Sequence, residues 1–179
     1  GKILPRATTI SLQIFVIYLG ITVMCALSYV AVGLTAFDAI VHAFTTVSTG
    51  GFSNYDSSFG HFSGAVEYVA IIFMIMAALP FVRYVQLVNG NSRAIISDTQ
   101  IKTFLITTLL VAIFVFFVLN NLFPGDWESA LRKSLFNITS IISGTGYSSD
   151  NYMAWGGMLV SVIFFIGLIG GCAGSTTCS

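Results

Sequence analysis

Charged residues are scarce in this sequence, and their scarcity excludes several classes of protein. Only 8% of the 179 residues are Asp, Glu, Lys or Arg, whereas 56% are hydrophobic. Soluble domains contain about 25% charged residues. The formal net charge is zero, so the chain lacks the basic excess that attracts nucleic acid. This composition predicts an integral membrane protein that binds no nucleic acid.

Cysteine and catalytic groupings are also scarce. The three cysteines are Cys25, Cys172 and Cys178, and they fit neither a paired disulfide framework nor the spacing of a zinc site. We interpret them as small buried residues. The apolar segments carry no carboxylate pair, histidine cluster or Ser/His arrangement, so we expect neither an enzyme nor a covalent cofactor.

Long apolar segments are abundant instead. A helix needs about 20 apolar residues to cross a bilayer. Three segments reach this length, and a fourth apolar run follows them: residues 9–34, 62–88, 103–122 and 153–169. In the second of these segments Pro80 is expected to kink the helix. Residues 37–47 and 127–142 have helical patterns about half as long, so we expect them to enter the membrane only part way.

A polar, glycine-rich phrase follows each half-length helix. The first phrase is Ser48-Thr49-Gly50-Gly51-Phe52-Ser53 and the second is Ser143-Gly144-Thr145-Gly146-Tyr147-Ser148. Non-helical backbone persists at membrane depth only where protein buries it or where it lines a water-filled path. Two such interruptions therefore indicate a pore.

The order span, half-span, polar phrase, span occurs twice, which predicts two repeats, residues 1–98 and 99–179. A shift of 95 residues matches Ser48 with Ser143 and Gly51 with Gly146. A shift of 96 instead matches Thr49-Gly50 with Thr145-Gly146. The sequence leaves both registers open. Because the last segment stops without polar flanks, we also expect this chain to be a piece of a longer polypeptide.

Charges near the span ends predict the orientation. One side is mostly basic, with Lys2, Arg6, Arg83, Arg93 and Lys102 against Asp98. The other side is mostly acidic, with Asp38, Asp56, Glu67, Asp126, Glu128 and Asp150 against Arg132 and Lys133. Basic residues favour the cytoplasmic side, so the polar phrases are expected near the outer face. Both repeats then run in the same direction, as parallel repeats around a central path do.

The polar phrases have the chemistry of a cation path. A half-length helix that enters from outside points its partially negative C-terminus inward, and the backbone carbonyls that follow can replace the water shell of an ion. The ion-binding candidates are Val47, Ser48, Thr49, Gly50, Gly51, Ile142, Ser143, Gly144, Thr145 and Gly146. Hydroxyl groups in these phrases either add oxygen ligands or bond the loops to their neighbours. Asp56 and Asp150 are either acids at an outer mouth or ordinary solvated carboxylates.

A third polar segment ends the chain. It comprises Gly170, Gly171, Cys172, Ala173, Gly174, Ser175, Thr176 and Thr177, followed by Cys178 and Ser179. It lacks the GK[ST] ending and the strand of a phosphate-binding loop. Two interpretations remain open, a mobile break in the ion path or close helix packing through small residues.

These three segments resemble the Trk/Ktr/HKT superfamily of potassium transporters, in particular its bacterial TrkH type. V-S-T-G-G-F-S, I-S-G-T-G-Y-S and G-G-C-A-G-S-T-T are similar, in this order, to the family's second filter, third filter and intramembrane loop. The resemblance implies four membrane-pore-membrane repeats around one path, of which this chain holds the second and an incomplete third. It further implies potassium bound at Thr49, Gly50, Thr145 and Gly146, with filter glycines that favour potassium over sodium, and a gate at residues 170–177.

The resemblance also implies potassium uptake across the bacterial inner membrane, with the filters on the periplasmic side. Rubidium is the expected surrogate ion, and the implied partners are a second copy of the protein and a cytosolic, nucleotide-binding TrkA-type ring. One alternative is a sodium- or proton-coupled symporter, which requires a buried ionisable residue, and only Glu67 and Arg83 are candidates. A second alternative is a membrane scaffold whose glycines serve helix packing.

Overall fold

The computed structural model describes residues 3–122 and 124–177, and every regular element within these ranges is a helix. The fold class is therefore all-α, as predicted. In chain order the elements are α1 (Ile3–Ala31), α2 (Ala36–Val47), the 3₁₀ helix η1 (Ser58–His61), α3 (Ala65–Ala77), α4 (Phe81–Val88), α5 (Arg93–Ile96), α6 (Thr99–Leu122), α7 (Trp127–Ile142), the 3₁₀ helix η2 (Tyr152–Trp155) and α8 (Gly157–Gly167).

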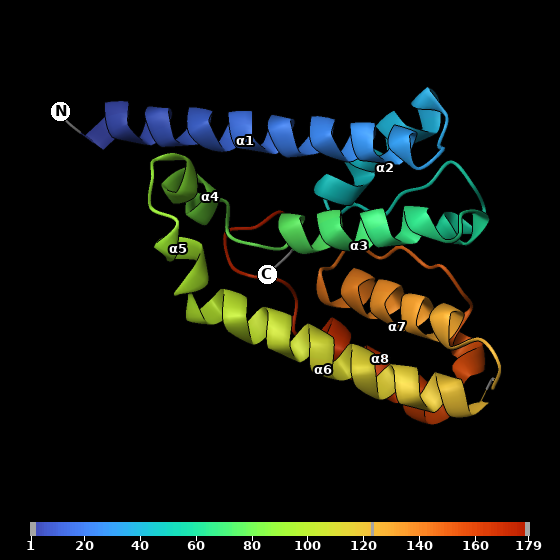
Figure 1. The fold of residues 1–179 in the computed structure, drawn as a ribbon. Coiled ribbons are helices and arrows are strands. Elements are labelled where there is room, and N and C mark those ends of the chain that lie inside the picture. The colour runs from blue at the N-terminus through green and yellow to red at the C-terminus, as the bar shows by residue number, and fades with distance from the viewer. Residues whose placement is uncertain (1–2, 123, 178–179) are drawn as a thin grey trace.

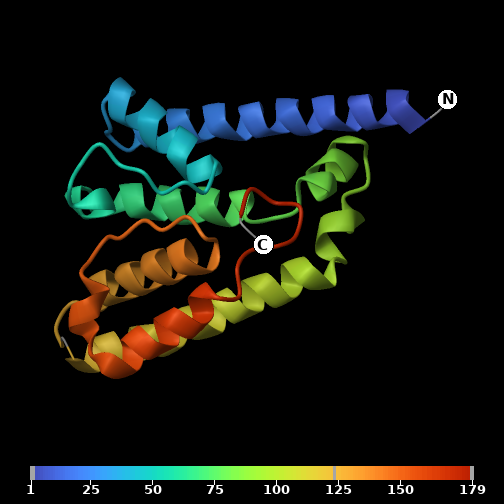
Figure 2. The ribbon, with the colours of Figure 1, turned by 180° about the vertical axis from the view of Figure 1, so that it is seen from behind.

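The helices lie roughly side by side in one elongated bundle (Figure 1). Helix α1 lies along one edge, α3 beside it, α7 next, and α6 with α8 along the opposite edge (Figures 1 and 2). Helix α2 packs against α1 and α3, whereas α7 packs against α3, α6 and α8. Helices α2 and α7 run in the same direction, and each is followed by an extended segment that returns toward the end where its helix began.

Among the residues that the structure describes, two helices by themselves have the length and apolarity of membrane spans. They are residues 7–31 of α1 and the whole of α6. Many of their large apolar side chains, such as Leu12, Phe15 and Leu110, are exposed on the surface of the bundle. Lipid favours such side chains on a protein surface, whereas water does not. The chain is a membrane protein on this evidence together with its composition.

The two half-length helices begin at capped positions and match their predicted extents. In α2 the Thr35 side chain accepts a hydrogen bond from the Asp38 N–H at 3.1 Å. In α7 the Asp126 side chain accepts one from the Ser129 N–H at 3.2 Å. Such caps satisfy amide groups that the first helical turn leaves without partners. With 12 and 16 residues, both helices are too short to cross a bilayer.

The span predicted over residues 62–88 is bent at Pro80, as expected, but the bend is large. The structure has two helices there, α3 and α4, whose axes differ by 87°. Pro80 lies at the break, where it lacks an N–H and its ring excludes a continuous helix. The C-terminal segment occupies this break: the Cys172 N–H donates to the Ala78 carbonyl at 3.1 Å, and the Phe81 N–H donates to the Gly174 carbonyl at 2.9 Å.

The last apolar run is also broken. Residues 153–169 contain the end of η2 and then α8, which has only 11 residues. Gly156 separates these two elements with φ +99°, a conformation that suits glycine and interrupts a helix. The chain then leaves α8 as the irregular segment that reaches the α3–α4 break.

A buried ion pair joins the two halves of the chain. Glu67 of α3 is 1% exposed, and its carboxylate accepts a hydrogen bond from the Arg132 guanidinium of α7. Arg132 also contacts Glu128, whose Oε1 accepts a hydrogen bond from the Tyr68 hydroxyl at 3.0 Å. This pairing fixes α3 against α7.

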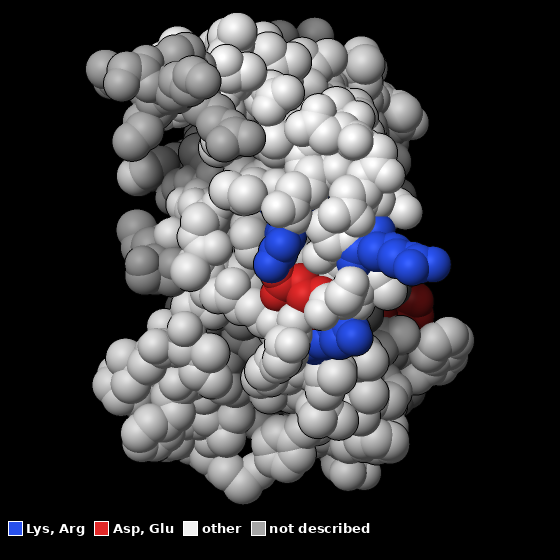
Figure 3. Space-filling model, turned by 90° about the vertical axis from the view of Figure 1, so that its left-hand side faces the viewer, with Lys and Arg blue, Asp and Glu red and all other residues white. Residues whose placement is uncertain are grey.

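The opposite end of the bundle carries the predicted basic groups. Figure 3 shows Lys and Arg side chains gathered around an acidic patch at this end. Arg93 and Lys102 are exposed there, and Arg83 Nε lies 2.6 Å from Asp98 Oδ2. The hydrogen bond from the Ile101 N–H, with the Arg83 pair, holds the pKa of Asp98 below its usual range. Lys2 and the Arg6 side chain lie outside the described part.

Candidate functional site

The two polar phrases begin with the same backbone turn. After α2, Thr49 adopts φ +51°, and after α7, Gly144 adopts φ +70°. The Thr49 N–H donates to the Thr46 carbonyl and the Gly144 N–H donates to the Ile141 carbonyl, both at 3.1 Å. A left-handed residue with this hydrogen bond is a common way to end a helix.

The next turn of each phrase identifies the register. The Gly51 N–H donates to the Thr45 carbonyl, and the Gly146 N–H donates to the Ser140 carbonyl, each at 3.2 Å. Gly51 and Gly146 also share a left-handed conformation, with φ +65° and +83°. All of these pairs are 95 residues apart. The two loops are therefore equivalent in backbone structure at a shift of 95, rather than 96.

The two phrases touch each other. An ideal Cβ atom placed on Gly51 would lie 1.9 Å from the Thr145 carbonyl oxygen, far inside van der Waals contact. The same test at Gly146 finds no atom within 4 Å. Gly51 is therefore required by the close approach of the second phrase, whereas Gly146 faces open space at the same structural position.

Hydroxyl groups of the phrases bond to nearby protein groups. Ser143 Oγ and Thr145 Oγ1 are 2.8 Å apart, and Ser140 Oγ donates to the Tyr147 carbonyl at 2.7 Å. Thr49 Oγ1 lies 2.7 Å from the Ser48 carbonyl and 2.8 Å from the Thr176 carbonyl. These bonds favour the interpretation that the hydroxyls bond the loops to their neighbours.

The C-terminal segment lies against the first phrase and the α3–α4 break. Besides the Thr49 contact, Thr176 Oγ1 donates to the Ala77 carbonyl at 3.1 Å. Within the segment, Ser175 Oγ lies 2.6 Å from Thr177 Oγ1, and a Cβ on Gly171 would lie 2.6 Å from Thr177 Oγ1. The segment is thus a folded loop held by hydrogen bonds. Cys178 and Ser179 lie outside the described residues.

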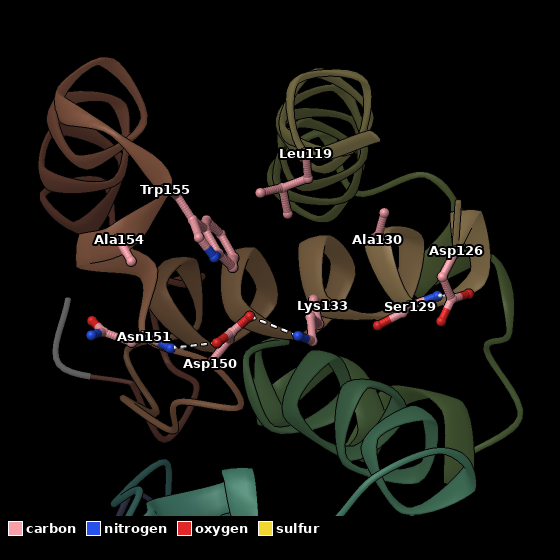
Figure 4. A pocket seen from close by; sticks show the side chains of 9 residues that line it. All are labelled: Leu119, Asp126, Ser129, Ala130, Lys133, Asp150, Asn151, Ala154 and Trp155. Atoms are coloured by element: carbon pink, nitrogen blue, oxygen red, sulfur yellow. Dashed lines mark hydrogen bonds and ion pairs between the residues drawn. The ribbon is translucent and has the colours of Figure 1, made fainter. Parts of the chain in front are cut away.

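The two acids predicted at an outer mouth differ in their surroundings. Asp150 Oδ2 lies 2.8 Å from Lys133 Nζ, and Asp150 Oδ1 accepts a hydrogen bond from the Asn151 N–H at 2.8 Å. Figure 4 shows this pair at one side of a cavity of about 270 Å³ between α6, α7 and η2. Asp56 is exposed on the segment after the first phrase. Of these two acids, Asp56 is exposed, whereas Asp150 is partly exposed and paired with Lys133.

Several positioning contacts escaped the sequence analysis. His42 of α2 is fully buried, and its Nε2 lies 2.9 Å from Ser53 Oγ at the end of the first phrase. Asn137 of α7 donates from Nδ2 to Ser149 Oγ at 2.9 Å, just beyond the second phrase. Polar residues at buried positions of two short helices were the available signal, because buried polar groups require partners.

Side chains of the described residues form no cluster of three or more His, Cys, Asp or Glu that could hold a metal ion. The oxygen atoms that the two phrases present are those of backbone carbonyls and hydroxyl groups. Such ligands suit weakly held monovalent ions, which must enter and leave a conduction path.

An all-helical membrane bundle whose half-length helices point at paired glycine-rich turns has the architecture of a cation-transporting membrane protein. The comparisons agree with this class. The chain belongs to the TrkH family, described as cation transport proteins, whose family model matches residues 1–179.

Curated relatives match nearly the whole chain. The potassium uptake protein TrkI of Halomonas elongata is 35% identical over 179 residues, and TrkH of Escherichia coli K12 is 31% identical over 181 residues. Each match covers 98% of this chain but only 36% and 37% of the relative. The chain therefore spans about a third of the length of these transport proteins.

A solved structure supports the same fold. The crystal structure of the potassium transporter TrkH from Vibrio parahaemolyticus superposes with a TM-score of 0.90 at 29% sequence identity. The match covers 96% of this chain and 38% of that protein. The predicted family and fold are confirmed by these findings.

Proposed function

We propose that this chain forms part of a potassium-uptake protein and that its two polar phrases line the ion path. The observation that carries the proposal is the pair of equivalent left-handed turns at the ends of α2 and α7, in contact at Gly51 and Thr145. The relatives are named as Trk system potassium uptake proteins, which supports potassium as the transported ion.

In this proposal residues 47–51 and 142–146 act as two selectivity filters. The C-terminal ends of α2 and α7 supply partial negative charge, and the carbonyls of Thr49, Gly50, Thr145 and Gly146 replace water around potassium. Potassium is the cargo, with rubidium as a surrogate. The glycine conformations at Gly51 and Gly146 allow the backbone to turn where other residues resist.

We further propose that residues 1–98 and 99–179 are two parallel repeats, the second of them incomplete. A path of four repeats would draw its remaining ligands from segments outside this chain. The basic end near Arg93 and Lys102 then faces the cytoplasm of a bacterium, and the filters face the periplasmic side of the inner membrane.

The loop at residues 170–177 is proposed as the gate beneath the filters. Its hydrogen bonds to Ala77, Ala78 and Phe81 place it in the α3–α4 break, and Thr49 contacts its Thr176 carbonyl. A segment held by a few hydrogen bonds can move without unfolding a helix. This placement supports obstruction of the path until the loop shifts.

Asp56 is proposed as the main acid at the outer mouth of the ion path. Its exposed carboxylate raises the local concentration of cations by electrostatic focusing. Asp150 contributes less to such a field because Lys133 neutralises it at 2.8 Å. A homodimer and a cytosolic, nucleotide-binding TrkA-type subunit are proposed as partners within the lipid bilayer.

Two other functions are less well supported. Coupled symport requires an ionisable group that is free to change its charge, but Glu67 is paired with Arg132, and Arg83 with Asp98. A packing scaffold would place its glycines at helix contacts, whereas Gly51, Gly144 and Gly146 occupy left-handed turns.

Rubidium uptake into vesicles that carry the complete native protein tests the proposal. Unlabelled potassium should block the uptake, and sodium should not. Gly50→Ser and Gly146→Ser should weaken this preference. A side chain at Gly146 meets no atom within 4 Å but strains the left-handed backbone at φ +83°, so the preference is compared only in variants that fold. If folded protein takes up no rubidium, or if both variants keep the wild-type preference, the proposed filter is wrong.

A further inference from the structure

Tyr147 is anchored at both of its ends, by two different helices. Its backbone carbonyl accepts a hydrogen bond from Ser140 Oγ of α7 at 2.7 Å. Its side chain is 1% exposed. Tyr147 directly follows Gly146, so any constraint on it acts on the second phrase.

The phenol of Tyr147 reaches α2, about 100 residues earlier in the sequence. Its oxygen lies 2.5 Å from Thr45 Oγ1 and 3.2 Å from Thr46 Oγ1. It also donates to the His42 carbonyl at 3.2 Å. Contacts with three residues on about one turn of a short helix leave little freedom for the ring, and the Phe59 ring packs against it with centroids 4.7 Å apart.

The same part of α2 holds the first phrase. The Thr45 carbonyl accepts hydrogen bonds from the Gly50 N–H at 2.8 Å and from the Gly51 N–H at 3.2 Å. His42 Nε2 lies 2.9 Å from Ser53 Oγ. Tyr147 therefore links the second phrase to the residues that shape the first one.

We propose that the Tyr147 hydroxyl is a positioning group that sets the separation of the two filters and thereby the discrimination between potassium and sodium. This inference rests on the proposed function. Carbonyl sites distinguish ions by the size of the cage and by the number and field of their oxygens. The Tyr147 hydroxyl joins the second filter to α2, the helix that precedes the first filter. This connection restricts both the size of the cage and the arrangement of its oxygens.

The equivalent residue of the first phrase has no such group. At the shift of 95 residues Tyr147 corresponds to Phe52, which lacks a hydroxyl and is 75% exposed. The hydrogen bonds from a phrase to the neighbouring half-length helix are therefore specific to Tyr147 and the second phrase.

The test compares Tyr147→Phe with Tyr29→Phe in the complete native protein. Tyr29 is a matched control because it is fully buried, and its hydroxyl lies 2.9 Å from Thr46 Oγ1 in the same cluster, but it extends from α1 and this bond joins it to α2 rather than to a phrase. The readout is the ratio of sodium to potassium concentrations that halve rubidium uptake. Uptake rate and thermal unfolding are measured alongside.

Tyr147→Phe should lower this ratio roughly three- to ten-fold, the range expected for one lost hydrogen bond, while Tyr29→Phe leaves it unchanged. If Tyr147→Phe does not fold, Thr45→Val removes the same contact from the other side and should lower the ratio in the same direction. An unchanged ratio in a folded variant, or an equal fall in Tyr29→Phe, overturns the inference. Absence of selective uptake in the wild type instead overturns the proposed function.

Discussion

The two half-length helices and their phrases have one backbone form but different residues at its critical positions. The left-handed turn that ends each helix is Thr49 in the first unit and Gly144 in the second. Glycine adopts this conformation at no steric cost, whereas a β-branched residue is strained in it. Thr49 contacts the C-terminal loop through its hydroxyl at 2.8 Å, which Gly144 has no side chain to do.

Turns of the same backbone form therefore make different contacts in the two units. The second unit has a relaxed turn and, through Tyr147, a tie to its neighbour. The first unit has a strained turn that holds Thr176, and a glycine, Gly51, that the second phrase approaches closely. Changes at equivalent positions are therefore expected to have unequal effects.

The largest effect is expected from the buried ion pair between Arg132 of α7 and Glu67 of α3. Arg132→Met leaves the buried Glu67 carboxylate without its partner, and breaking such a pair costs about 3–5 kcal/mol. The neighbouring Lys133→Met breaks a partly exposed pair within the second unit, for which about 0–1 kcal/mol is expected. Denaturation of the complete protein in detergent measures both. Equal losses in the two variants would contradict this account of the interface.

The next effect concerns the two equivalent glycines. Gly51→Ala places a methyl group against the Thr145 carbonyl and adds left-handed strain, together about 2–5 kcal/mol. Gly146→Ala has open space, so only about 1–2 kcal/mol of strain is expected. Expression level and unfolding of both variants test the difference. A Gly51→Ala protein as stable as Gly146→Ala would show that the two phrases do not meet at this point.

Much of this arrangement was predictable from sequence because its signals are local. Turn-forming residues after Val47 and Ile142, and apolar runs of limited length, predicted both short helices and both phrases. The 87° break and its occupation by the loop were not predictable, because Pro80 indicates only that a helix is interrupted. The backbone groups that lose their helical partners at this break bond to residues more than 90 positions away, such as Cys172 and Thr176. Nothing near Pro80 in the sequence indicates these partners.

The contacts between the two halves of the chain were not predictable from the sequence for a similar reason. Glu67 was one of two candidates for a buried charge, but nothing near it in sequence indicates Arg132 as its partner. In the sequence, Tyr147 lies 95 residues after Phe52 and differs from it by a hydroxyl group. Its hydroxyl acquires a role only when the fold brings it to Thr45.

A smaller effect is expected at the strained turn. Thr49→Gly makes the first turn resemble the second, removing both strain and the contact with Thr176, whereas Thr49→Val removes the contact alone. Both should release the loop and raise rubidium uptake in the complete protein several-fold, since a hydrogen bond contributes ~1 kcal/mol. Ser48→Ala is the neighbouring control. Uptake that stays at the wild-type rate in both Thr49 variants would show that this contact does not hold the gate.

The smallest effect is a pH dependence at the basic end. The pKa of Asp98 is lowered in the folded state by the Ile101 N–H and by Arg83. Its stabilising contribution is therefore present above the unfolded pKa and is lost as pH falls through the folded value. In the Asp98→Asn variant the unfolding temperature should fall less steeply as the pH is lowered than it does in the wild type. Arg83→Gln combined with Asp98→Asn should add little to the single change; full additivity would show that the pair does not interact.

The most direct test of the central claim is anomalous diffraction from crystals of the complete protein grown with rubidium. The account predicts a rubidium peak coordinated by carbonyl oxygens of both residues 48–51 and residues 143–146, and its loss when potassium replaces rubidium. A fully occupied rubidium site elsewhere in the protein, with none between the two phrases, would contradict the assignment of these phrases as the ion path.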